Sequence, residues 1–354
     1  MSQLFTPLKL REIVIPNRIF MSPMCQYSSS NGKPQDWHLV HYGSRAVGKC
    51  GLVVTEATAV TQEGRISPDD LGIWSDEHAE AFIPIVDFIK AQGSIAGIQL
   101  AHAGRKASVS APWLGGTPLS SENRGWQSLA PSPIPFMADF QTPREATIED
   151  LDNINNQFSA ATRRSLQAGF QVVELHAAHG YLLHQFLSPL SNHRTDEFGG
   201  SLENRMRFPL RIAKTVRDLW PENLPMFVRI STTDWVDGGW DVEQSLEFCR
   251  QLKKLGIDLI DCSSGGLVAD AVIPVGPGFQ TPMATEIKSQ VKIKTAAVGL
   301  ITEPAQAEQI IVTGLADAVF LGRELLRDPY WPLHAAQILK DNGSWPAQYE
   351  RAKV

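Results

Sequence analysis

The residues most able to do chemistry lie close together, in the run His176-Ala177-Ala178-His179-Gly180-Tyr181. Two imidazoles three residues apart can converge on one acceptor, and two N–H donors on a carbonyl oxygen make the attached double bond electrophilic. A neighbouring phenol such as Tyr181 can then supply a proton. A zinc site with His176 and His179 as ligands is the competing interpretation, although the sequence offers no evident third ligand. We therefore expect His176, His179 and Tyr181 to be catalytic.

Two further groups suggest an anionic ligand. Arg229 ends an apolar run, and a buried charge needs a partner, either an anionic cofactor ring or a structural carboxylate. Gly299, Gly322 and Arg323 follow the last two apolar runs of the chain. Glycines let backbone N–H groups approach a phosphate, and an arginine adds a bidentate ion pair. These positions predict a phosphate site.

The elements that must position these residues are short apolar runs alternating with amphipathic stretches. Continuous apolar runs of this length are typical of parallel strands buried on both faces. The expected strands are 18–22, 52–55, 95–100, 170–175, 226–230, 259–262, 295–298 and 318–321. The expected helices are 77–92, 147–168, 201–219, 241–255 and 303–313. Most of these helices stop before a glycine, which supplies the left-handed C-terminal turn.

Eight alternating units favour an α/β (β/α)8 TIM barrel that occupies residues 1–354 as a single domain. An open nucleotide-binding sheet would show a G-x-G-x-x-G motif after its first strand, where this chain has none. The connection 102–146 after the third strand is unusually long, and such loops are often functional. We expect a lid insertion there, with a packed structural subdomain as the alternative.

Composition excludes several classes of function. The 354 residues are 43% hydrophobic and carry a formal net charge of −6, so a nucleic-acid partner is not expected. Apolar runs fall short of the roughly 20 residues that span a bilayer, and a cytoplasmic location is expected. The four cysteines form no CxxC pair, so Cys50, Cys249 and Cys262 are interpreted as core residues. Cys25 lies in a different context.

Several long motifs resemble the Old Yellow Enzyme family, over essentially the whole chain. The motifs are Pro16-Asn17-Arg18 running into Ser22-Pro23-Met24-Cys25, Gln99-Leu100-Ala101-His102-Ala103-Gly104-Arg105, the run from His176 to Tyr181, and Gly199-Gly200-Ser201-Leu202-Glu203-Asn204-Arg205. Cysteine after Pro-Met, with Tyr27 following, resembles the YqjM/xenobiotic-reductase (thermophilic-like) branch of FMN-dependent ene-reductases.

The resemblance implies a role for each matching position. The implied FMN-binding residues are Ser22, Pro23, Met24, Cys25, Ala57, Gln99, Arg229, Gly299, Gly322 and Arg323. Among them Cys25 would tune the flavin potential and Arg229 would stabilise the reduced ring. His176 and His179 would bind the substrate oxygen, Tyr181 would protonate the adjacent carbon, and Tyr27 would line the pocket.

The implied reaction is ping-pong hydride transfer from NADPH, with NADH the less favoured donor, to electron-poor alkenes such as α,β-unsaturated carbonyls, maleimides or nitroalkenes. The resemblance also places Arg351, in the C-terminal segment 340–354, at a neighbouring subunit's active site, which implies a homodimer or homotetramer. Two alternatives stay open at this point: a metal-dependent barrel enzyme, and a non-catalytic flavin sensor with Cys25 as its redox switch.

Overall fold

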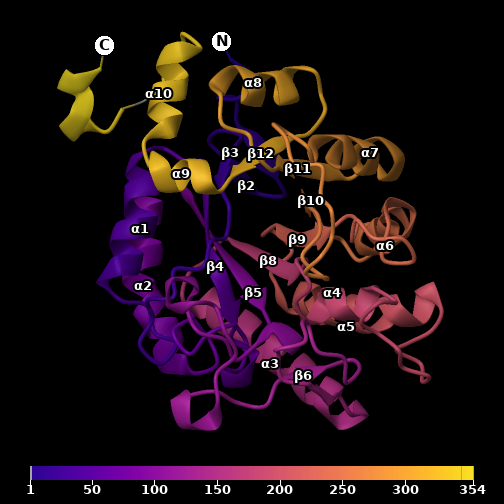
Figure 1. The fold of residues 1–354 in the computed structure, drawn as a ribbon. Coiled ribbons are helices and arrows are strands. Elements are labelled where there is room, and N and C mark those ends of the chain that lie inside the picture. The colour runs from indigo at the N-terminus through magenta and orange to yellow at the C-terminus, as the bar shows by residue number, and fades with distance from the viewer. Residues whose placement is uncertain (1, 344, 354) are drawn as a thin grey trace.

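A computed structural model describes residues 2–343 and 345–353, and its centre is a closed barrel of eight parallel strands. The strands are β3 (Ile19–Met21), β4 (Leu52–Ala59), β5 (Ile95–Ala101), β8 (Val172–Ala177), β9 (Met226–Ser231), β10 (Leu259–Ser263), β11 (Lys294–Val298) and β12 (Ala318–Leu321). They pair in chain order, and β12 closes onto β3. The helices surround this ring (Figure 1). The predicted (β/α)8 TIM barrel is confirmed.

The helices of the described residues differ from the expected ones mainly in number. They are α1 (Asp36–Val47), α2 (Asp76–Ala91), α3 (Ile148–Gln167), α4 (Leu182–Leu187), α5 (Leu202–Leu219), α6 (Val242–Lys254), α7 (Thr281–Val291), α8 (Pro304–Val312), α9 (Arg323–Arg327) and α10 (Trp331–Ile338). The five expected helices are α2, α3, α5, α6 and α8, each within about two residues of its predicted ends. Each helix in the described part of the chain is too short or too polar to span a membrane.

A short antiparallel hairpin, β1 (Leu8–Leu10) and β2 (Ile13–Ile15), precedes the barrel and was not expected from the sequence. Its Leu8, Leu10 and Ile15 belong to one apolar cluster with barrel residues such as Phe20 and Phe227. Strand β3 follows the hairpin directly, so the cluster lies toward the end at which the strands begin. This arrangement leaves the C-terminal ends of the strands free to carry polar groups.

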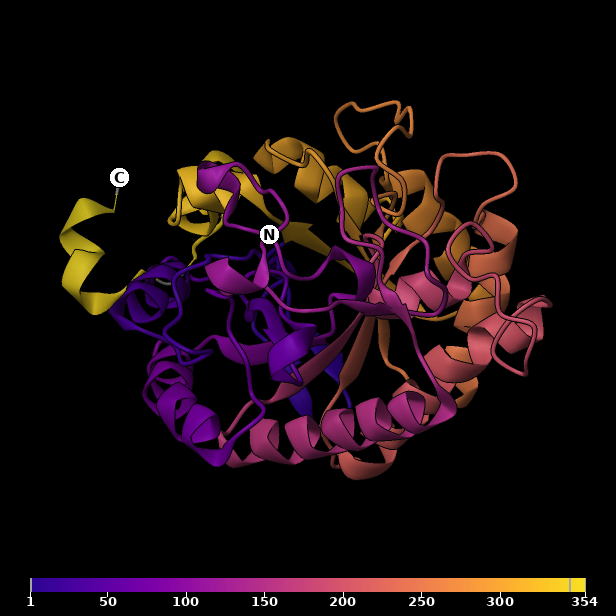
Figure 2. The ribbon, with the colours of Figure 1, turned by 60° about the horizontal axis from the view of Figure 1, so that its bottom comes forward.

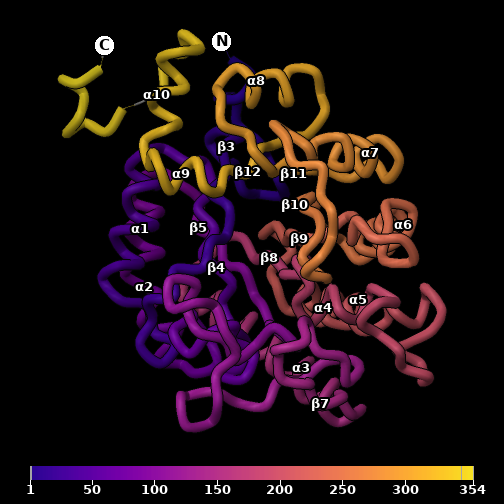
Figure 3. Tube along the Cα trace, in the orientation of Figure 1, coloured from indigo at the N-terminus to yellow at the C-terminus, as the bar shows by residue number. Residues whose placement is uncertain are grey.

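The connection 102–146 winds over the barrel as short turns rather than long elements (Figures 2 and 3). It contains η2 (Gly104–Lys106), η3 (Pro112–Leu114), η4 (Ser121–Asn123), and the two-residue strands β6 (Leu129–Ala130) and β7 (Arg144–Glu145). Buried Ala103, Ala107 and Val109 form a small cluster with Ile66, against which Cys25 and Tyr181 pack. The connection therefore contacts two of the residues expected to act in the site.

We expect Phe20→Ala to destabilise the barrel strongly. Phe20 is fully buried, and its ring lies 5.3 Å from the ring of Phe320 in an edge-on contact. Removing such a side chain leaves a cavity and costs about 3–5 kcal/mol. Urea unfolding followed by fluorescence measures the change. Val312→Ala, at a position that is 59% exposed, serves as the control and should change stability by less than about 0.5 kcal/mol. Equal effects of the two substitutions would contradict this assignment of the core.

Candidate active site

His176, His179 and Tyr181 form one cluster at the C-terminal end of β8. The ring of His176 lies 5.3 Å from that of His179 and 5.0 Å from that of Tyr181, with both contacts edge-on. His176 is still on the strand, whereas His179 and Gly180 adopt positive φ angles of 58° and 72°. This left-handed pair reverses the chain, so that residues on both sides of the turn face each other.

Neighbouring elements hold the His179 side of the cluster in place. The Ser263 Oγ at the end of β10 lies 2.7 Å from His179 Nε2, and the backbone N–H of His179 donates to Ser231 Oγ at 2.8 Å. The Lys106 ammonium donates to the His179 carbonyl at 3.0 Å and lies 5.0 Å from the centre of the Tyr181 ring. The His176 Nδ1, by contrast, is buried without a hydrogen-bond partner among the described residues. That nitrogen is available to a ligand.

Burial determines the protonation of the cluster. It lowers the pKa of His176 and of His179 well below the usual value, and the nearby Arg229 lowers both further. Burial also raises the pKa of Tyr181 well above the usual value, with smaller contributions from Cys25 and Tyr27. Near neutral pH the cluster therefore presents two uncharged imidazoles and a protonated phenol. These groups can donate hydrogen bonds to a substrate carbonyl or nitro oxygen and a proton to the carbon next to that carbonyl or nitro group.

The residues expected to contact the flavin lie on adjacent strand ends. Ala57 of β4 and Gln99 of β5 are register partners, and Ser22 follows β3 and donates its N–H to Leu321 of β12. A Cβ placed on Gly322 would lie 3.7 Å from Met24 Sδ, and its other near neighbour is Ser22. Gly322 therefore lies beside the segment 22–24. The Ser22 hydroxyl is buried without a hydrogen-bond partner among the described residues. An orphaned donor beside a glycine is compatible with a bound polar cofactor.

The other two residues expected to bind phosphate, Gly299 and Arg323, differ in their surroundings. Gly299 has a φ of 114°, a conformation that other residues rarely adopt, and a Cβ there would lie only 2.6 Å from Gln280 Nε2. The backbone conformation, together with this close contact, accounts for glycine at this position without any ligand. Arg323 is exposed and begins α9 directly after Gly322. Gly299 follows β11 and Arg323 lies just after β12, so both residues are at the rim where barrels often bind phosphate.

Arg229 has a protein partner. Its Nε lies 3.1 Å from Asp261 Oδ2 on the neighbouring strand β10, and both side chains are buried. Of the two partners that the sequence allowed for Arg229, a cofactor ring or a structural carboxylate, the carboxylate is thus present. This contact does not remove Arg229 from the site, because the same residue is the register partner of His176 on β8.

Cys25 lies beside two buried carboxyl groups, Glu56 and Asp70, of which sequence reasoning did not include Asp70. Its Sγ and one oxygen each of Glu56 and Asp70 lie within 4.8 Å of one another. Burial raises the pKa of Cys25 well above the usual value, and the charges of Asp70 and Glu56 raise it further. The thiol is therefore the stable form, which argues against a readily oxidised thiolate switch. Within the part of the chain that the structure describes, His176 and His179 belong to no group of three metal-ligating side chains.

Of the other expected site residues, Tyr27 lies at the edge of the cluster and Arg351 lies away from it. The Tyr27 ring makes an edge-on contact with Trp113 of the long connection, at 5.6 Å between ring centres. Arg351 is exposed in η5 (Ala347–Ala352), which stands outside the ring of helices beside α10 (Figure 1). The structure thus does not bring Arg351 to the active site of its own chain. Residues 344 and 354 of the C-terminal segment lie outside the described residues.

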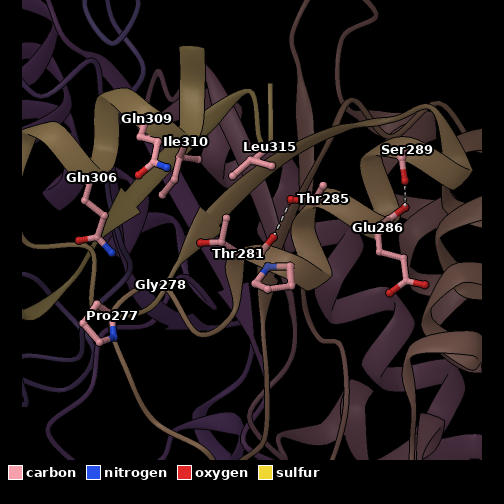
Figure 4. Close-up of a pocket in the computed structure, with 11 residues that line it drawn as sticks. Pro277, Gly278, Thr281, Thr285, Glu286, Ser289, Gln306, Gln309, Ile310 and Leu315 are labelled. Carbon is pink, nitrogen blue, oxygen red and sulfur yellow. Dashed lines mark hydrogen bonds between the residues drawn. The ribbon is translucent and has the colours of Figure 1, made fainter. Parts of the chain in front are cut away.

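A separate groove of about 580 Å³ lies between α7 and α8 (Figure 4). Pro277 and Gly278, from the loop before α7, form one end of it, and Gln306 and Ile310 project into it from α8. None of the expected catalytic or flavin-contacting residues lines this groove. The groove is therefore separate from the expected site at the barrel mouth.

Sequence reasoning missed several residues that the structure places in the site. Lys106 directly follows the motif that runs from Gln99 to Arg105, and its contact with the His179 carbonyl gives it a supporting role. Glu174 and Asp261 interrupt apolar strands, which is the same signal that singled out Arg229. Asp70 carried no comparable signal, because it lies in a loop that only the fold brings beside Cys25.

We expect Asp70→Asn to stabilise the protein at high pH. Burial and the charge of Glu56 raise the pKa of Asp70 to about 8, whereas an unfolded aspartate titrates near ~3.9. Because the folded pKa is raised, wild-type stability falls as the pH rises from about 4 to about 8. The Asn side chain keeps an oxygen for the Ile66 and Ser67 N–H groups and removes the titration.

The difference in unfolding free energy between Asp70→Asn and wild type should grow by about 2–4 kcal/mol between pH 5 and pH 8.5, at ~1.4 kcal/mol per pKa unit. Urea unfolding at the two pH values measures it. Asp69→Asn, one residue earlier in the same loop, should show no such growth. A difference for Asp70→Asn that is independent of pH would refute the assignment.

Comparison with known proteins identifies the family of this chain. The sequence model of the NADH:flavin oxidoreductase / NADH oxidase family matches residues 3–342. An NADPH dehydrogenase of Bacillus velezensis is 49% identical over 352 residues, covering 99% of each chain. The structure of an old yellow enzyme homologue from Zymomonas mobilis superposes with a TM-score of 0.79 at 25% identity, covering 99% of this chain and 98% of that one.

A 2-naphthoyl-CoA reductase superposes with a TM-score of 0.86 at 25% identity, and the match covers 96% of this chain but only 52% of that longer one. The Old Yellow Enzyme resemblance, the oxidoreductase activity and the FMN cofactor expected from the sequence are thereby confirmed. The chain belongs to the NADH:flavin oxidoreductase / NADH oxidase family of FMN-dependent oxidoreductases.

Proposed function

We propose that the chain is an ene-reductase that uses FMN and NADPH to reduce the C=C bond of α,β-unsaturated carbonyls, maleimides or nitroalkenes. The observation that carries the proposal is that His176, His179 and Tyr181 lie together at the end of one strand. The two imidazoles are uncharged and the phenol keeps its proton. The Bacillus relative named NADPH dehydrogenase supports NADPH over NADH as the donor. Cys25 and Tyr27 favour the YqjM/xenobiotic-reductase-like branch.

The barrel mouth would hold FMN through residues from several strand ends. Ser22, Pro23, Met24 and Cys25 would contact the ring, with Ala57 and Gln99 at its pyrimidine side. Arg229 would face the negative charge of the reduced ring, while Gly299, Gly322 and Arg323 would hold the phosphate. When bound, the flavin carries the hydride between nicotinamide and alkene.

The protein residues orient and polarise the substrate. His176 and His179 donate hydrogen bonds to its carbonyl or nitro oxygen and draw electron density from the conjugated C=C bond. Tyr181 gives its phenolic proton to the carbon beside the oxygen-bearing group. Tyr27 lines the pocket. Because nicotinamide and alkene would use the same site in turn, the kinetics should be ping-pong.

We expect Tyr181→Phe to slow the alkene half-reaction about 10²–10⁴-fold, the usual contribution of a positioned general acid. Flavin reduction by NADPH should keep its wild-type rate, because that step needs no proton from Tyr181. Anaerobic stopped-flow absorbance with NADPH, and then with 2-cyclohexenone, separates the two halves. Equal slowing of both halves would rule out the proposed role and would indicate a general structural defect.

We further propose that Arg351 completes the active site of a second subunit. The C-terminal η5 is held beside α10 by an edge-on contact between Tyr349 and Tyr330, with ring centres 6.0 Å apart. Apolar side chains are exposed nearby, including Ile338 on α10 at 64%. This arrangement supports a homodimer or homotetramer in which each segment reaches a partner.

Arg351→Ala should raise the KM for the alkene and lower kcat/KM about tenfold, the loss expected when one charged hydrogen bond is removed. Steady-state kinetics measures the change, and light scattering confirms that the oligomer persists. Lys353→Ala, an exposed cation two residues further on, is the matched control and should behave like wild type. A fully active monomer would contradict the shared site.

A further inference from the structure

Four polar side chains lie in a row on adjacent strands inside the barrel. They are Gln99 on β5, Glu174 on β8, Arg229 on β9 and Asp261 on β10, and none is more than 6% exposed. Gln99 is the register partner of Glu174, and Arg229 is the register partner of Asp261. Charges buried this deeply are costly unless they are paired or neutralised. The row therefore needs an explanation beyond packing.

The contacts leave part of this row unsatisfied. Gln99 Nε2 donates to Glu174 Oε1 at 2.8 Å, while Glu174 Oε2 has no hydrogen-bond partner among the described residues. Arg229 Nε lies 3.1 Å from Asp261 Oδ2, but the two are not aligned as a hydrogen bond, and neither Asp261 oxygen accepts one from any residue that the structure describes. The carboxyl groups thus have free oxygens and share a single nearby cation.

Counting charges shows an excess of acid. Two ionised carboxylates and one guanidinium would leave the buried row with a net negative charge in a low-dielectric interior. Burial raises the pKa of both acids, and the charge of Asp261 raises that of Glu174 further, while Arg229 lowers both. The other titratable neighbours add no charge: His176, the next inward residue of β8, is neutral, and burial keeps Cys262 of β10 a thiol.

We propose that Glu174 and Asp261 share one proton beside Arg229, and that they act as positioning residues which couple proton uptake to reduction of the flavin. The proposal rests on the proposed function, because it requires Arg229 to face the bound flavin. Reduction by hydride adds two electrons and one proton, and leaves a negative charge near Arg229. That charge competes for the guanidinium, so the affinity of the carboxyl pair for a proton increases.

The consequence is a second proton taken up from solvent upon reduction. This uptake occurs over the pH range between the titration of the pair in the oxidised enzyme and its titration in the reduced enzyme. Below that range the pair already holds the proton in both states, and above it the proton is absent from both. Outside the range, two electrons are accompanied by one proton only.

Redox titration of the FMN-loaded enzyme at a series of pH values tests the proposal. In wild type, the plot of midpoint potential against pH should contain a segment whose slope corresponds to two protons per two electrons. In Glu174→Gln, which keeps an acceptor for Gln99, and in Asp261→Asn, the whole plot should show the one-proton slope. Glu308→Gln is the control: hydrogen bonds from Ser2, Gln3 and Leu4 lower the pKa of Glu308 against its burial, so it holds no proton to lose.

Infrared difference spectroscopy gives a second readout that does not depend on turnover. The wild-type-minus-variant spectrum should contain a protonated-carboxyl C=O band for both variants, with and without FMN, but not for Glu308→Gln, and the band of the protonated Asp70 carboxyl cancels in each difference. Difference spectra without the band, or a proton slope shared by wild type and both variants, would overturn the proposal. Alkene turnover is measured separately, so absence of ene-reductase activity with the band intact would refute the proposed function and not the shared proton.

Discussion

The site depends on the closure of eight parallel strands into one hydrogen-bonded ring. Because every strand runs in the same direction, every C-terminal end opens at the same rim, and residues as distant in the chain as Ser22, His176 and Gly322 meet there. The ring also excludes water from its interior. Any polar group that faces inward must therefore find a partner, lose its charge, or bind a ligand.

The exclusion of water lowers the pKa of buried bases and raises the pKa of buried acids. This effect accounts for most of the site's electrostatics. It disfavours every charged form, so the imidazoles of His176 and His179 stay neutral while Tyr181 and Cys25 keep their protons. The same effect raises the proton affinity of the carboxyl groups behind the mouth. The proposed polarisation of the substrate and the proposed retention of a proton on the carboxyl pair thus have one physical origin.

Most of the fold could be predicted from the sequence, because long buried strands and amphipathic helices leave periodic patterns. The β1–β2 hairpin could not, since three-residue strands carry too little pattern, and α1 was obscured because it exposes Trp37 and Val40 while it buries His38 and His41. The motif residues of the site were predictable for the same local reason. Their partners were not: Asp261 beside Arg229 follows from strand register, and Asp70 beside Cys25 follows from the course of a loop.

The left-handed backbone at His179 limits what this position can become. A φ of 58° is tolerated by glycine and, among other residues, chiefly by asparagine, aspartate and histidine. Of these, only histidine and asparagine carry a side-chain N–H that could meet a substrate oxygen in the absence of added protonation. If position 179 supplies the second donor, as proposed, its left-handed turn leaves asparagine as the one alternative to histidine, whatever substrate the pocket comes to accept.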